Sequence, residues 1–71
     1  MLTGTVKRVE ATTGSGLIAT EDGSEYYFHR AGIVRPLDFD DLFGGERVSF
    51  EIETHKQGPR AIQVSRHKVV R

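Results

Sequence analysis

Short runs of alternating apolar and polar residues, separated by glycine-containing turns, constrain the fold of this chain more than any other feature. The clearest run is residues 47–53, in which Val48, Phe50 and Ile52 share one face and the polar residues between them share the other. An alternation of period two is typical of a β-strand with one buried face. We therefore predict a strand here, and no segment of the chain requires a helix longer than one turn.

Four further segments carry strand signals, namely residues 4–9, 17–20, 25–29 and 61–65. The Asp22-Gly23 and Gly58-Pro59 pairs are turn signals that separate them. Residues 30–45 lack periodicity, which predicts a long loop between the third and fourth strands. Five short strands favour an all-β, antiparallel five-stranded barrel, because closure removes exposed sheet edges. The expected core consists of Val6, Ile18, Phe28, Val48, Phe50, Ile52, Ile62 and Val64.

Composition argues against several classes of protein. The chain has 71 residues and no cysteine, so a disulfide framework or a cysteine-based zinc site cannot stabilise it. It lacks an apolar stretch of the roughly 20 residues that span a bilayer. It also lacks a nucleophile beside a base, a metal-ligand spacing of histidines and a phosphate-binding glycine loop that leads into a helix. We expect one soluble, cytoplasmic, monomeric domain over residues 1–71 that is not an enzyme, contacts no membrane and binds no cofactor, metal or small-molecule substrate.

Charge is balanced overall but unevenly distributed. Residues 1–54 contain five Lys and Arg against ten Asp and Glu, a net charge of −5, whereas residues 55–71 contain five Lys and Arg and no acid, a net charge of +5. The net charge of zero argues against a protein that coats polyanions by bulk charge. The basic final segment is either a phosphate-contacting edge or a solvated chain end.

The order of motifs resembles the cold-shock domain family, whose members are oligonucleotide-binding (OB) barrels. The matching segments are Gly4-Thr5-Val6-Lys7, Gly14-Ser15-Gly16-Leu17-Ile18, Tyr26-Tyr27-Phe28-His29, residues 42–50 and Gly58-Pro59-Arg60-Ala61. They follow one another in register over almost the whole chain. In the family the first ribonucleoprotein motif carries two phenylalanines that stack on bases, and here Ser15 and Leu17 occupy their places.

The resemblance implies a binding face with nine candidate residues: Lys7, Arg8, Ser15, Leu17, Tyr27, His29, Arg30, Lys56 and Arg60. Tyr27 and His29 would stack on bases, and the cations would contact phosphates or lie on a base. Ser15 would donate a hydrogen bond or serve as a turn residue, and Leu17 would form an apolar floor or a protein contact. Phe39 is either a further aromatic of this face or a core residue.

The function implied is binding of single-stranded RNA or DNA with low sequence specificity, in the manner of an RNA chaperone or a regulator of transcription or translation. The alternative is an OB-type protein-interaction module that has lost most of its stacking surface, with an oligosaccharide as a further possible ligand. The chain could also be one unit of a larger protein.

Overall fold

The computed structural model describes residues 2–35 and 37–67, which contain five β-strands and two 3-10 turns. The strands are β1 (Leu2–Glu10), β2 (Ser15–Ala19), β3 (Glu25–His29), β4 (Arg47–His55) and β5 (Gly58–Arg66). The turns η1 (Arg30–Gly32) and η2 (Phe39–Asp41) lie in the predicted loop. All five predicted strands are confirmed, with bounds that differ by a few residues except in β3. In the described chain no helical segment is long and apolar enough to cross a membrane.

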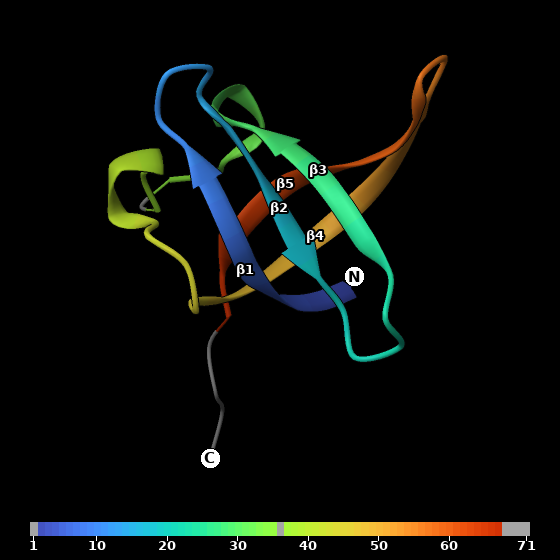
Figure 1. Ribbon diagram of the computed structural model, residues 1–71, viewed down its shortest axis with the longest axis horizontal. Helices are drawn as coiled ribbons and strands as arrows, with labels where there is room; N and C mark the ends of the chain where they lie inside the picture. The colour runs from blue at the N-terminus through green and yellow to red at the C-terminus, as the bar shows by residue number, and fades with distance from the viewer. Residues whose placement is uncertain (1, 36, 68–71) are drawn as a thin grey trace.

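The strands close into a barrel in the order β1-β2-β3-β5-β4, so the predicted all-β barrel is confirmed. Figure 1 shows β1, β2 and β3 side by side, β4 and β5 behind them, and the β4–β5 hairpin projecting beyond the barrel. The prediction of a purely antiparallel sheet is wrong at one seam, because β3 and β5 run parallel with Tyr27 opposite Arg60. A closed ring with an odd number of strands cannot alternate direction throughout, so one neighbouring pair has to run parallel.

The barrel interior is filled by apolar side chains from every strand and from the long loop. The buried set is Val6, Ile18, Phe28, Leu37, Phe39, Leu42, Val48, Phe50, Ala61 and Val64. The rings of Phe28 and Phe39 lie 6.4 Å apart between centroids, so Phe39 is a core residue rather than part of an exposed face. Gly16 permits the close packing here, because a Cβ atom at this position would lie 2.5 Å from the carbonyl oxygen of Arg8.

Two residues expected in the core lie outside it. Ile52 is 37% exposed, because β4 pairs with β1 only as far as Phe50 and then continues into the projecting hairpin with one neighbour. Ile62 is only half-buried, because an irregularity in the β4–β5 register shifts the alternation of β5. Gln63 has φ 50° at this point, and Ala61 is buried in place of Ile62, whereas Val64 is buried as expected.

Candidate nucleic-acid interface

A row of side chains crosses the outer surface of the barrel from β1 to β4. Strand pairing places Arg8 opposite Leu17, Leu17 opposite Tyr27, Tyr27 opposite Arg60 and Arg60 opposite Glu53. Directly paired residues project from the same face of a sheet, and neighbouring strands lie about 4.8 Å apart. We call these five residues the cross-strand row. The row brings together residues that are far apart in the sequence, and four of them are predicted binding residues.

Two aromatic rings of this face are accessible. Tyr27, at the middle of the row, is 53% exposed, whereas its neighbour Phe28 is fully buried, so the predicted assignment of the two faces of β3 is confirmed. His29 is exposed at the end of β3, and its Nδ1 accepts a hydrogen bond of 3.2 Å from the backbone N–H of Ala31. This bond caps η1 and holds the imidazole ring beside the face.

Three of the predicted cations form ion pairs with acids on the same surface. Lys7 pairs with Glu25, a guanidinium nitrogen of Arg8 lies 3.5 Å from Glu10, and Arg60 donates a 3.2 Å hydrogen bond to Glu53. The side chains of all three pairs are about half exposed, so each pair adds little to stability. Their larger effect is on binding, because each acid partly cancels the attraction of its cation for a phosphate.

Arg30 and Lys56 lie at opposite ends of the face. The guanidinium carbon of Arg30 is 5.9 Å from the centre of the Phe39 ring, a cation–π arrangement that holds this side chain against the end of the barrel. Lys56 is exposed at the turn between β4 and β5. Within the predicted basic segment, β5 contributes Arg60 and Arg66, whereas Lys68 and Arg71 lie outside the described residues.

Ser15 and Leu17 differ in accessibility although both project from the outer side of β2. Leu17 is half-buried and lies between Arg8 and Tyr27 in the cross-strand row. Ser15 is only 3% exposed, and its hydroxyl lies 2.6 Å from that of Thr13 and donates to the Tyr27 hydroxyl at 3.4 Å. The Ser15 hydroxyl is therefore engaged within the protein, and a contact of Ser15 with a ligand stays a prediction.

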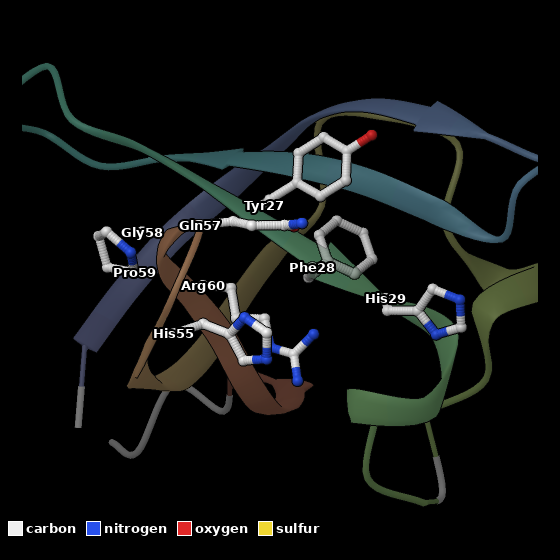
Figure 2. Close-up of a pocket in the computed structure, with 8 residues that line it drawn as sticks. All are labelled: Tyr27, Phe28, His29, His55, Gln57, Gly58, Pro59 and Arg60. Atoms are coloured by element: carbon white, nitrogen blue, oxygen red, sulfur yellow. The ribbon is translucent and has the colours of Figure 1, made fainter.

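A hollow of about 380 Å³ lies between β3 and the β4–β5 hairpin, next to Tyr27. It is lined by Tyr27, Phe28, His29, His55, Gln57, Gly58, Pro59 and Arg60, as Figure 2 shows. Sequence reasoning did not find His55 and Gln57 as parts of this site. The signal that would have indicated them is the parallel pairing of β3 with β5, because this pairing brings the hairpin beside Tyr27.

Glu46 organises the turn that precedes β4, at the edge of the barrel beside β1. Partial burial raises the pKa of its carboxyl, but backbone N–H donors, including those of Phe43 at 3.0 Å and Gly44 at 2.8 Å, outweigh this effect and lower the pKa overall. The turn thus presents Phe43 with 83% of its surface exposed. Sequence reasoning did not single out this aromatic residue.

Comparison with known families agrees with this arrangement. A model of the family described as the 'cold-shock' DNA-binding domain matches residues 2–67. The chain belongs to the cold-shock domain family. The resemblance predicted from the motifs is therefore confirmed, and this family in general binds nucleic acid and is non-enzymatic.

Curated cold-shock proteins match the chain over almost its whole length. The major cold shock protein of Streptococcus pyogenes serotype M1 is 35% identical over 66 residues, which are 93% of this chain and 97% of that protein. Cold shock-like protein CspA of Vibrio cholerae is 38% identical over 64 residues, 90% of this chain and 91% of that protein. Cold shock-like protein CspB of Yersinia pestis is 36% identical over 63 residues, 89% of this chain and 90% of that protein.

Proposed function

We propose that this cold-shock domain binds single-stranded RNA or DNA across the outer face of β1, β2 and β3 and the adjoining β4–β5 hairpin. Binding is weak and has low overall sequence specificity. The domain acts by binding, as an RNA chaperone or a regulator of transcription or translation, and not by catalysis.

The accessible ring of Tyr27 at the middle of the cross-strand row is the observation on which this proposal rests. A flat aromatic side chain, 53% exposed on a rigid strand and bordered by Arg60 and Leu17, offers a stacking surface to any base. Alanine substitution at such stacking positions costs about 1–3 kcal/mol per base. Exposed His29 lies further along the same strand and extends the surface on which a second base can stack.

The electrostatics of the face support weak rather than tight binding. Lys7, Arg8 and Arg60 are each paired with an acid, so a phosphate has to compete with a carboxylate for each of them. Phosphate neutralisation supplies most of the sequence-independent affinity of nucleic-acid-binding proteins, and its contribution falls as salt is added. We therefore expect stacking to supply a larger share of the affinity than in a strongly basic domain.

Titration of a fluorescein-labelled single-stranded oligonucleotide, followed by fluorescence anisotropy at low and moderate salt, tests the proposal. We expect saturable binding to the single strand that weakens as salt rises, and weaker binding to a duplex of the same sequence. Failure to bind any single-stranded DNA or RNA at low salt would contradict the proposed function.

The alternative of a protein-interaction module has a specific observation in its favour. Phe43 is the most exposed large apolar side chain of the described residues, and Leu17 replaces an aromatic residue on the presumed binding face. Exposed apolar surface can mark a protein contact. The same titration separates the two functions, because a protein-interaction module would show no saturable binding to single strands.

A further inference from the structure

The hollow beside Tyr27 has the size and the lining of a site for one planar group with polar edges. Its volume of about 380 Å³ is near the lower end of the range for small-molecule pockets. In Figure 2 the Tyr27 ring stands on β3, and the Gln57 side chain extends from the hairpin into the space beside it. The wall thus combines an aromatic face with the amide of Gln57 and the guanidinium of Arg60. No carboxylate is among the described residues that line it.

Arg60 is better placed to recognise a base than to bind a phosphate. Its guanidinium donates one hydrogen bond of 3.2 Å to Glu53, which leaves most of its five N–H donors available. The carboxylate of Glu53 would repel a phosphate approaching Arg60, whereas an uncharged base meets no such repulsion. Glu53 also restricts the orientation of the planar guanidinium. Arg60 itself is directly paired with Tyr27 of β3 and lines the same hollow.

We propose, on the basis of the proposed function, that this hollow holds one base of the bound single strand and selects guanine at that position. Guanine presents two neighbouring acceptors, O6 and N7, which match two parallel N–H donors of an arginine. Arg60 is the residue that makes this contact, Tyr27 is the stacking surface, and Glu53 is a positioning residue. Specificity is then confined to one position, so the domain still tolerates most sequences.

The other bases fit this site less well. Adenine places a donor beside N7, which opposes an arginine donor. Thymine and uracil present acceptors that are separated by a ring N–H donor. Cytosine has adjacent acceptors on its pairing edge, which single-stranded recognition can use, but its smaller ring covers less of Tyr27. The expected order of affinity is guanine first, cytosine second, and adenine and thymine last.

Four labelled seven-nucleotide DNAs test this order by anisotropy: an all-thymine strand and three strands whose central thymine is replaced by guanine, cytosine or adenine. One guanine per strand avoids self-association of guanine-rich DNA. We expect the guanine strand to bind at least about fivefold more tightly than the adenine strand, the lower limit for one bidentate contact. Equal Kd values for all four strands would overturn the guanine inference and leave the proposed function intact. If none of the four DNA strands binds, and none of their RNA counterparts binds either, both the guanine inference and the proposed function are overturned.

The Arg60→Lys variant distinguishes base recognition from phosphate binding, because it keeps the charge and removes the planar fork of donors. We expect it to abolish the guanine preference, measured as the ratio of the Kd values for the guanine and adenine strands, whatever its effect on the Kd for the all-thymine strand. Arg66→Lys is the matched control, since Arg66 is also an exposed arginine of β5 but does not line the hollow. A guanine preference that persists in Arg60→Lys would refute the assignment of Arg60.

A measurement on the unaltered protein makes the test independent of how the variants fold. The side-chain Nε–H resonance of Arg60 in a ¹H–¹⁵N spectrum is expected to shift on addition of the guanine strand and to shift less with the adenine strand. Equal shifts with both strands, or no shift with either, would contradict the proposed contact.

Discussion

Replacing Leu17 with phenylalanine is expected to strengthen single-strand binding, because it adds a second ring beside Tyr27. Position 17 is directly opposite Tyr27 in the β2–β3 pairing and directly opposite Arg8 in the β1–β2 pairing. The Cβ atoms of directly opposite residues lie about 4.5–5.5 Å apart, so the two rings would form one stacking surface. The leucine is only half-buried and belongs to the outer face, so its replacement leaves the core intact.

The expected size of the effect follows from the stacking of one further base. Such stacking contributes about 1–3 kcal/mol, which corresponds to between about 5-fold and 150-fold in Kd. Ordering of the new side chain and of the nucleotide reduces this gain, so we expect a result near the lower value. The single variant is cleaner than one that also changes Ser15, because a ring at position 15 has to displace the Thr13 hydroxyl that lies 2.6 Å from the serine hydroxyl.

Anisotropy titration of a thymine oligonucleotide measures the gain, after sedimentation has shown that the variant is monomeric and thermal unfolding has shown that it is folded. Val34→Phe is the matched control, since Val34 is 44% exposed and lies outside the cross-strand row. A ring there should leave Kd unchanged. If folded, monomeric Leu17→Phe binds no more tightly than the parent protein, the bases do not contact this face, and the protein-interaction alternative is then favoured.

Three further predictions concern stacking, salt and pH. Tyr27→Ala should weaken oligonucleotide binding by about 1–3 kcal/mol with little change in stability. Phe50→Ala removes a fully buried ring and should lower the free energy of unfolding, measured by denaturant titration, by about 3–5 kcal/mol. Equal destabilisation by both would contradict the assignment of faces. Glu25→Gln frees Lys7 from its ion pair and should make the slope of log K against log salt steeper by about 0.7, the value for one phosphate on a single strand; an unchanged slope would mean that no phosphate reaches this lysine. Because the pKa of Glu46 is lower in the folded than in the unfolded protein, its carboxylate stabilises the fold above the unfolded pKa, and this stabilisation is lost as the pH falls through the folded pKa. Thermal unfolding between neutral and acidic pH should therefore show a smaller loss of Tm in Glu46→Gln, and identical pH profiles would contradict this role.

The number of strands, their order along the chain and the outward position of Tyr27 could be predicted from the amino-acid sequence. Period-two alternation and turn residues such as Asp22-Gly23 are local signals, and they remain valid wherever a strand pairs regularly. This is why β3 has the predicted bounds and why Phe28 and Tyr27 lie on the expected sides. The motif order also sufficed to predict membership of the cold-shock domain family.

What the sequence left undetermined depends on contacts between strands that are distant along the chain. The register irregularity near Gln63 arises where β4 and β5 pair, and no local pattern indicated that Ala61 would replace Ile62 in the core. Alternation placed Ser15 on the outer side of β2 but could not show that Thr13 and Tyr27 cover it.

The candidate site likewise depends partly on local sequence signals and partly on contacts between distant strands. Residue types and motif order indicated the stacking residue and the cations. The register of the β4–β5 hairpin decided that Glu53 pairs with Arg60. Only the closed barrel, with its parallel seam between β3 and β5, decided that Arg60 lies beside Tyr27 and that Gln57 lines the hollow next to Tyr27. The physical reason is that side-chain periodicity is a property of one strand, whereas a binding surface depends on which strands are neighbours and in what register they pair.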